Sequence, residues 1–267
     1  MTSRIASMPN FRDAGGHRTA GGYLRRGLLF RSDQLGGLSR EEGELLSGLG
    51  LKVVYDLRTD AERSMLPEAR IPGATHVPLD VLADDRQSLP ARLLRLLVEP
   101  ESAEPLLGNG RGAAMFLESY RSYVRMPSAR LALGRLYSGL ADPDSLPALC
   151  HCTTGKDRTG WACAALQTLL GVPYDDVLAD YLASNRFVLP RYQPHVDAFA
   201  ARGGDPMLLM PILCVRPEYL EASFDEVRRE FGSIEGYFRD GLGITDGTIA
   251  ELRSRFVGSS PHERSAR

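Results

Sequence analysis

The sequence predicts an α/β fold with a central, mostly parallel sheet flanked by helices. Short apolar runs suited to buried strands alternate with longer segments suited to helices, and this alternation is typical of α/β domains. With 267 residues and 43% hydrophobic content, the chain can form one large domain or a domain with an appended helical lobe. We assign residues 1–257 to a single domain and residues 258–267 to a disordered tail.

One helix in the N-terminal part of the chain is marked at both ends. Ser39 and Glu42 have the spacing of a capping box, and Gly50 follows the last turn, so residues 39–49 predict a helix. The strands predicted in this part are residues 23–31, as a hairpin or an edge strand, and residues 52–57 and 76–79.

Helices predominate in the second half of the chain. Gly171 and Pro173 separate two of them, because glycine often follows a helix and proline fits the first turn of the next. A short apolar run at residues 145–151, after a turn-like Asp-Pro-Asp sequence, predicts a buried strand. The predicted helices are residues 128–140, 158–170, 173–184, 217–231, 234–240 and 245–256.

Two stretches, at about residues 84–111 and 187–215, carry many Pro, Gly and Arg residues without a clear period. Long segments of this kind inside a domain are commonly functional loops. We therefore predict that both stretches are insertions or lids.

Residues 151–160, His-Cys-Thr-Thr-Gly-Lys-Asp-Arg-Thr-Gly, join the predicted strand to the helix that follows it. The five residues between Cys152 and Arg158 can curl so that successive backbone N–H groups point at one anion. Arg158 can close this ring with a planar fork that pairs with two phosphate oxygens. The helix dipole, Arg158 and Lys156 favour a thiolate at Cys152, placed to attack phosphorus in line. The predicted phosphate-binding residues are Thr153, Thr154, Gly155, Lys156, Asp157 and Arg158.

Lysine is rare in this chain, yet one lies inside the loop. Of 32 basic residues, only Lys52 and Lys156 are lysines. We attribute Lys156 to a steric requirement, because a compact ammonium fits beside a phosphate where a second guanidinium would not.

The decapeptide resembles the loop of cysteine-based protein tyrosine phosphatases, specifically the bacterial PtpB-like tyrosine and dual-specificity group. The resemblance extends along most of the chain. It implies a phosphatase-type fold with a helical lid, which we place at residues 187–215, a cysteinyl-phosphate intermediate, and neither a metal nor another cofactor. The further blocks that carry the resemblance are residues 10–16, 30–33, 54–58 and 181–185.

Two aspartates are candidates for the general acid that protonates the leaving oxygen. Asp80 lies at the predicted C-terminal end of a strand, where doubly wound sheets place their sites. Asp157 lies inside the loop, and the family resemblance points to this position, although its side chain could instead hold Arg158 in place. We slightly favour Asp157 and leave Asp80 open.

Other residues near the loop have supporting roles or ordinary structural ones. By resemblance, the Thr159 hydroxyl helps the Cys152 thiolate to leave in the second step, whereas a threonine at a helix start is also a common cap. His151 is expected to order the loop through ring hydrogen bonds rather than to act as a base. For Arg12, Asp13 and Arg58, contact with the site or substrate and a structural ion pair are equally expected.

Cys150 and Cys163 are thiols close in sequence to Cys152. Cys150 shares a strand face with Cys152, and Cys163 follows on the next helix. Either could form a protective disulfide with an oxidised Cys152, but a buried bystander thiol is the expected role.

Composition excludes several other classes of function. The net charge of −2 gives no reason to expect nucleic-acid binding, and no segment is apolar and long enough for a membrane span. Four unpatterned cysteines and the lack of a signal peptide predict a cytoplasmic protein, and leave non-classical secretion and the oligomeric state open.

The sequence therefore predicts a phosphomonoester hydrolase that acts through Cys152, with protein phosphotyrosine as the favoured substrate and dual specificity allowed. The alternative substrates are phosphoinositides and small phosphorylated metabolites. The alternative from another class is an inactive phosphate-binding module, which the intact Cys152 and Arg158 disfavour.

Overall fold

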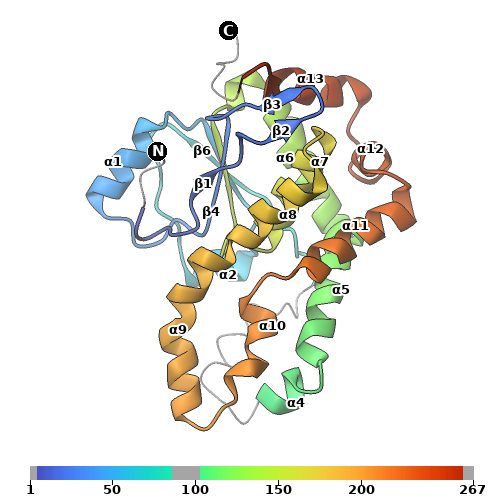
Figure 1. Cartoon of the computed structure of the whole chain (residues 1–267). Helices are drawn as coiled ribbons and strands as arrows, with labels where there is room; N and C mark the ends of the chain where they lie inside the picture. Colours follow the sequence, from blue (N-terminus) through green and yellow to red (C-terminus); the bar gives the residue numbers. More distant parts are fainter. Residues whose placement is uncertain (1–4, 86–102, 261–267) are drawn as a thin grey trace.

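A five-stranded sheet with the order β1-β4-β7-β5-β6 lies at the centre of the computed structural model, which describes residues 5–85 and 103–260 (Figure 1). Strands β4, β7, β5 and β6 are parallel, and β1 joins β4 in the antiparallel direction. The predicted α/β class with a mostly parallel sheet is confirmed. The strands are β1 (Arg12–Asp13), β4 (Leu29–Ser32), β5 (Val53–Asp56), β6 (Thr75–Pro78) and β7 (Ala148–His151).

A second, antiparallel sheet contains β2 (Arg18–Thr19), β3 (Gly22–Leu24) and β8 (Val257–Gly258). The single hairpin or edge strand predicted over residues 23–31 is wrong, because this segment divides between the two sheets. Its second half forms β4, which is fully buried between β1 and β7. Gly258, the first residue of the predicted tail, pairs with Tyr23 in this sheet, and residues 261–267 lie outside the described part.

The central strands are buried on both faces, and alternate residues enter different cores. In β7, Ala148 and Cys150 join the larger hydrophobic cluster, whereas Leu149 joins a smaller cluster on the opposite face. This follows from the two-residue period of a strand. The strand that leads to Cys152 is thereby fixed from both sides.

Helices cover both faces of the sheet. The smaller core lies under α1, whose N-terminus has the predicted capping box of Ser39 and Glu42, while the larger core contains α7, whose Trp161 is fully buried. The helices around the sheet are α1 (Arg40–Gly48), α2 (Asp60–Met65), α6 (Pro127–Ala141), α7 (Arg158–Leu169), α8 (Tyr174–Ala183), α11 (Pro217–Phe231), α12 (Ile234–Gly236) and α13 (Asp246–Phe256), with short turns η2 (Pro143–Ser145) and η4 (Tyr237–Gly241).

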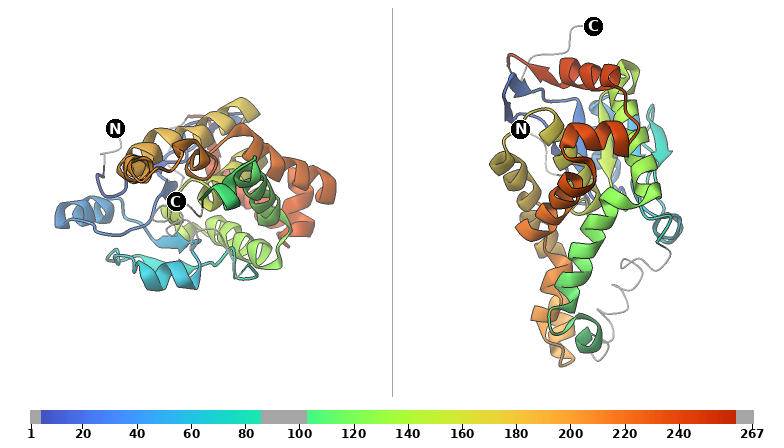
Figure 2. Two further views of the ribbon diagram at one scale, coloured as in Figure 1. Left: turned by 90° about the horizontal axis from the view of Figure 1, so that it is seen from below. Right: turned by 90° about the vertical axis from the view of Figure 1, so that its right-hand side faces the viewer.

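A helical arm extends beyond the sheet. Helix α9 and the lower part of α5 run side by side away from the body, with α10 between them and α4 near the tip (Figures 1 and 2). The predicted lid, residues 187–215, falls on this arm. The other predicted insertion or lid was residues 84–111. Its residues 86–102 lie outside the described part of the chain. The arm contains α4 (Ala103–Leu107), α5 (Arg111–Arg125), α9 (Asn185–Ala201), η3 (Pro206–Leu208) and α10 (Met210–Leu213).

Candidate active site

The loop between β7 and α7 is held open by hydrogen bonds from outside. Three of its carbonyl oxygens accept hydrogen bonds from donors on neighbouring segments. Because a trans peptide is planar, with its N–H opposite its C=O, these bonds turn the N–H groups of residues 154–156 toward the inside of the loop. Successive inward N–H groups of this kind can bind an anion. The three pairs are Gln34 N–H with the Thr153 oxygen (3.2 Å), Asn10 Nδ2 with the Thr154 oxygen (2.8 Å) and Arg31 Nη2 with the Gly155 oxygen (2.9 Å).

Gly155 is required by both conformation and space. Its φ of +67° lies in the left-handed region, which glycine adopts without strain. A Cβ at this position would lie 2.3 Å from the carbonyl oxygen of Ser32. The loop can therefore approach the end of β4 only with glycine here.

Arg158 is fixed by two parallel hydrogen bonds to Glu62. Arg158 Nη1 lies 2.6 Å from Glu62 Oε2, and Nη2 lies 2.7 Å from Oε1. Arg158 Nη1 also donates to the Leu57 carbonyl oxygen at 3.2 Å, and the Thr153 hydroxyl donates to Glu62. Bidentate pairing of this kind orients the planar guanidinium as well as neutralising it. Glu62 thereby connects the first and last parts of the loop.

Sequence reasoning missed Glu62. Its only signal was the Thr59-x-x-Glu62 spacing, which forms the capping box of α2 and resembles an ordinary helix start. Burial alone would raise the pKa of Glu62, but the charge and hydrogen bonds of Arg158, with those of Thr153 and the Thr59 N–H, lower it to about 2. The ionised pair therefore stabilises the fold above about pH 4.5, and this contribution is lost as the pH falls toward 2.

A second buried ion-pair group supports the loop from the side of β4. Arg31, which binds the Gly155 carbonyl, pairs with Asp180 of α8 at 2.8 Å, and Arg12 pairs with the same carboxylate at 2.9 Å. Burial alone would raise the pKa of Asp180, but the charges of Arg31 and Arg12 hold it well below its usual range. For Arg12 the structural ion pair, one of its two expected roles, is therefore observed.

The Lys156 side chain folds back from the loop toward α10. Its Nζ lies 3.0 Å from Asp157 and 3.0 Å from the carbonyl oxygen of Ile212, and it faces the Phe116 ring at 5.2 Å from the ring centre. Only 3% of Lys156 is exposed. The loop and the arm thus share one buried ammonium.

Asp157 is held by two side-chain donors. The Tyr120 hydroxyl donates to Asp157 Oδ1 at 2.9 Å, the same oxygen that Lys156 Nζ contacts at 3.0 Å, and Tyr181 in turn donates to the Tyr120 hydroxyl at 2.6 Å. Burial first, and then the charge of Asp157, raise the pKa values of Tyr120 and Tyr181 well above their usual range. Both phenols therefore remain donors near neutral pH.

Asp80 follows β6 and lies beside the N-terminus of α2. Its Oδ2 accepts the Asp60 N–H at 3.2 Å, and its Oδ1 accepts the Leu82 N–H at 2.9 Å. Both oxygens of Asp80 are therefore engaged by backbone groups. Thr159 lies in the first turn of α7, where its fully buried hydroxyl has no hydrogen-bond partner among the described residues.

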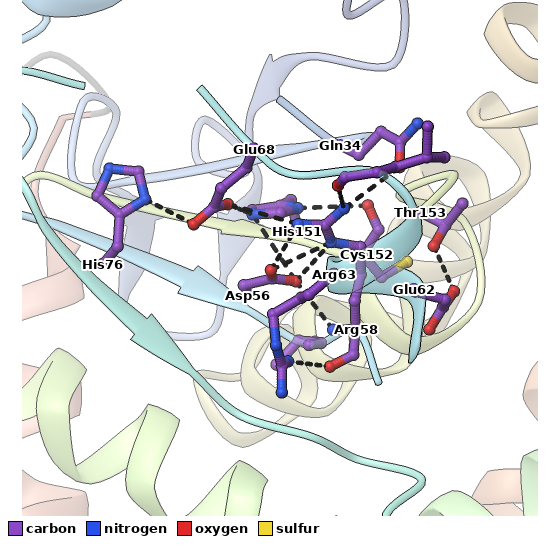
Figure 3. Close-up of polar contacts among 12 residues, drawn as sticks. Gln34, Asp56, Arg58, Glu62, Arg63, Glu68, His76, His151, Cys152 and Thr153 are labelled. Atoms are coloured by element: carbon purple, nitrogen blue, oxygen red, sulfur yellow. Dashed lines mark hydrogen bonds and ion pairs between the residues drawn. The ribbon is translucent and has the colours of Figure 1, made fainter. Parts of the chain in front are cut away.

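Asp13 and Arg58 have structural contacts. Asp13 accepts the N–H groups of Gly15 and Gly27, each at 2.8 Å, and so joins the two ends of the segment between β1 and β4. Arg58 forms a buried ion pair with Asp56 at 2.8 Å (Figure 3). For Arg58, too, the structural role is the one observed.

One group of side chains near the loop has metal-binding donor types. Ligand atoms of Asp56, Glu68 and His151 lie within 4.8 Å of one another. Arg58 Nη2 lies 2.8 Å from Asp56 and 3.8 Å from Glu68, so a guanidinium already supplies the positive charge between these carboxylates (Figure 3). The donor set therefore does not favour a metal ion.

Asp33, directly after β4, is a buried carboxylate beside the loop. It accepts the Asn10 N–H at 3.3 Å and pairs with Arg191 of α9 at 3.0 Å. Burial raises the pKa of Asp33 to about 6, although the charge of Arg191 and the backbone hydrogen bonds oppose the increase. This residue lies within a block that carried the family resemblance, but its burial could not be read from the sequence.

The neighbouring cysteines are buried thiols. Cys150 and Cys163 are each 1% exposed and unbonded, and burial raises the pKa of both. Both groups therefore favour the neutral thiol, as expected for bystanders.

Comparisons with known proteins identify the family. The sequence matches the family model of the tyrosine phosphatase family over residues 3–258. It is 32% identical to the triple specificity protein phosphatase PtpB of Mycobacterium tuberculosis, over 93% of this chain and 96% of the relative. A Cupriavidus necator protein, whose name assigns it provisionally to the tyrosine-protein phosphatases, is 32% identical over 94% of this chain and 86% of its own. A tyrosine-protein phosphatase of Nostoc commune is 24% identical over 84% of this chain and 72% of the relative.

The α/β fold and the similarity along almost the whole chain define the class of protein, which is a phosphatase. The chain belongs to the tyrosine phosphatase family, and the resemblance to PtpB-like enzymes is confirmed. Within residues 5–85 and 103–260, no helix combines the length and the apolar character needed to cross a membrane.

The pair of Glu62 and Arg158 leads to a testable prediction. Glu62→Gln should lower kcat/KM about 100-fold, because a displaced Arg158 guanidinium no longer orients the reacting phosphate. It should also lower the free energy of unfolding by about 3–5 kcal/mol, because Arg158 loses its buried counterion. Steady-state kinetics and thermal unfolding measure the two effects. Glu42→Gln, which removes the equivalent capping-box acid of α1, is the matched control and should leave kcat/KM unchanged. Equal kinetics in both variants would contradict the role of Glu62.

The buried Asp33 leads to a prediction about pH. Its folded-state pKa of about 6 lies above the ordinary value of 3.8, so the ionised form destabilises the fold above pH 6 and the penalty disappears below pH 3.8. Asp33→Asn should therefore raise the free energy of unfolding by about 1–3 kcal/mol at about pH 8, with little change at about pH 3.5. Urea unfolding at both pH values tests this, with the exposed Asp240→Asn as control. A lower stability at the higher pH would show that the Arg191 pair outweighs the burial of Asp33.

Proposed function

We propose that the chain hydrolyses phosphate monoesters, foremost phosphotyrosine on proteins, through a covalent intermediate on Cys152. The observation that carries this proposal is the outward anchoring of the loop carbonyls together with the fixed position of Arg158. These features support a site in which the inward N–H groups and the guanidinium bind one phosphate next to the buried Cys152.

Arg158 retains donors for a phosphate. Its contacts with Glu62 and Leu57 use three of the five guanidinium N–H groups. The Nε–H and the second Nη2–H have no partner among the described residues, and they form an edge that can pair with two equatorial phosphate oxygens. Burial alone would lower the pKa of Arg158, but the Glu62 charge and hydrogen bonds raise it above its usual value, so the group stays charged during the reaction.

The reaction proceeds in two displacements. The Cys152 sulfur attacks phosphorus, the bond to the ester oxygen breaks, and the leaving oxygen takes a proton from a general acid. Water then attacks the cysteinyl phosphate, the sulfur–phosphorus bond breaks, and the same carboxylate takes a proton from that water. The loop amides and Arg158 stabilise the charge on the equatorial oxygens in both steps. The unpartnered Thr159 hydroxyl supports a role in stabilising Cys152 as it leaves.

Asp157 is the proposed general acid. Asp80 uses both oxygens to bind backbone N–H groups, which supports a structural role for it. Asp157 instead shares the Lys156 ammonium with the Ile212 carbonyl of the arm, and a bound phosphate dianion would draw this ammonium away from the carboxylate. Loss of that contact makes Asp157 a better proton carrier when substrate is bound.

Protein phosphotyrosine is the substrate we favour within this class, because the relatives include tyrosine-protein phosphatases. One relative is a triple specificity protein phosphatase, so phosphoserine and phosphothreonine belong in the same substrate panel. Phosphoinositides and small phosphorylated metabolites, the alternatives left open by the sequence, complete the panel. Comparison of kcat/KM across phosphotyrosine, phosphoserine, phosphoinositide and small-metabolite phosphates decides among them.

The nucleophile is tested by Cys152→Ser. Turnover of para-nitrophenyl phosphate should fall to less than about 1% of wild type, because the serine hydroxyl stays protonated where the thiol ionises, while vanadate should still bind to the unchanged amides and Arg158. Calorimetry measures the binding, and EDTA should leave the wild-type rate unchanged. Cys214→Ser, a partly exposed thiol, is the matched control and should remain active. Substantial turnover by Cys152→Ser would exclude the covalent mechanism.

The two acid candidates are separated by leaving-group chemistry. A general acid contributes about 10²–10⁴-fold when the departing oxygen is basic and little when it leaves easily. Asp157→Asn should therefore lose much more rate on a phosphotyrosine peptide than on a highly activated aryl phosphate, and the basic limb of its pH–rate profile should disappear. Asp80→Asn should show a smaller loss. The reverse pattern would assign the acid to Asp80, and equal losses on every substrate would exclude both residues.

A further inference from the structure

Helix α5 carries three buried aromatic side chains on the face that contacts the loop. Phe116, Tyr120 and Tyr123 have the i, i+4, i+7 spacing of a single helix face. The Phe116 ring faces Lys156 Nζ at 5.2 Å, and one turn later the Tyr120 hydroxyl donates to Asp157 Oδ1 at 2.9 Å. Successive turns of α5 thus contact successive residues of the loop, and Tyr123 comes next along this face.

The Tyr123 hydroxyl lies near the charged groups of the site. Burial first, and then the charge of Asp157, raise the pKa of Tyr123 well above its usual range, whereas the charge of Arg158 opposes the increase. The charge of Cys152 acts on the same phenol, and Tyr123 in turn contributes to the raised pKa of Arg158. Because such effects weaken with distance, the hydroxyl lies close to these groups. The phenol keeps its proton near neutral pH and is therefore a donor.

This donor is not used within the described part of the protein. Tyr123 is only 5% exposed, yet its hydroxyl has no hydrogen-bond partner among the described residues. The oxygen is not one of the fully enclosed unpartnered atoms, so solvent can reach it. Buried phenols usually donate a hydrogen bond, and those of four other tyrosines in the larger core do so. These are Tyr120, Tyr137, Tyr181 and Tyr219.

We propose that Tyr123 is a further substrate-binding residue, whose hydroxyl donates a hydrogen bond to an equatorial oxygen of the phosphoryl group held by the loop. The inference rests on the proposed function, in which Arg158 and the loop N–H groups bind the same phosphoryl group. Tyr123 adds a neutral donor from the side of α5. It keeps its proton throughout, so the proton for the leaving oxygen still comes from Asp157. Because the phosphoryl group is common to every substrate, the contribution of Tyr123 does not depend on the leaving group.

The kinetic test is Tyr123→Phe, which removes the oxygen and keeps the ring packed against Tyr120 at 5.1 Å between centroids. We expect kcat/KM to fall about 10-fold, the effect of losing one hydrogen bond to a charged group. The factor should be the same for a phosphotyrosine peptide and for a highly activated aryl phosphate. A loss confined to the basic leaving group would assign Tyr123 to proton donation and overturn the binding role. Unchanged kcat/KM on both substrates would also overturn it.

The binding test uses vanadate and calorimetry in the Cys152→Ser background, where no thiolate is present. Adding Tyr123→Phe should weaken vanadate binding about 10-fold, because the hydroxyl acts on the anion itself. If the hydroxyl instead donates to the Cys152 thiolate, Tyr123→Phe alone should raise the pH midpoint of Cys152 alkylation, and vanadate affinity in the serine background should not change. That pair of results would overturn the proposal.

Tyr237→Phe is the matched control, because it removes a hydroxyl from another buried tyrosine of the same core. The Tyr237 ring packs against Trp161 at 5.9 Å between centroids. Burial raises the pKa of Tyr237, and the other contributions come from Trp161 and Arg130 rather than from the loop. This variant should keep the wild-type kcat/KM and vanadate affinity.

The outcomes separate this inference from the proposed function. Equal losses in Tyr123→Phe and Tyr237→Phe would assign the effect to repacking of the aromatic core and overturn the role of Tyr123. If the wild type neither turns over phosphate esters nor binds vanadate, the proposed function fails and the inference fails with it. If the wild type does both and Tyr123→Phe matches it, the inference alone fails.

Discussion

The structure of the site depends on how the carbonyl groups of the loop after β7 are held. An isolated loop would turn either edge of its peptides inward, but Asn10, Arg31 and Gln34 bind three consecutive carbonyl oxygens from outside. On the proposed function, the N–H edges already face the site of the anion before phosphate enters. The left-handed Gly155 follows from the same constraint, because its peptide must lie against the end of β4.

This scaffold requires buried charge, and each buried group described here has a defined partner. Arg31 and Arg12 share Asp180, Arg158 is bound by Glu62, and Arg58 is bound by Asp56. Removing one partner would leave an uncompensated charge in the interior, which costs far more than the net contribution of the intact pair. Such pairs fix positions more than they add stability, and fixed positions are what a phosphate-transfer site needs.

The local parts of this architecture could be predicted from the sequence, whereas the tertiary partners could not. The loop, the capped helix α1 and the helix after Cys152 have signals within a few residues of each other. Glu62 has the same capping-box spacing as Glu42, and only the fold brings Arg158 to one of the two. Residues 23–31 were predicted as one hairpin or edge strand, but Arg31 is fully buried in β4, where Asp180, far along the chain, supplies its counterion.

The single lysine of the loop shows where composition and geometry agree. Of 32 basic residues 30 are arginine, yet the position between Asp157, the Ile212 carbonyl and the Phe116 ring holds Lys156. An ammonium can bind a carboxylate and a carbonyl while it faces an aromatic ring, and its compact shape fits this buried position where a planar guanidinium would not. Ile212 belongs to α10 of the arm. The Lys156 ammonium therefore contacts both the arm and the Asp157 carboxylate of the loop. On the proposed mechanism, a phosphate dianion competes with both partners for Lys156, so substrate binding and the contact between loop and arm are energetically coupled.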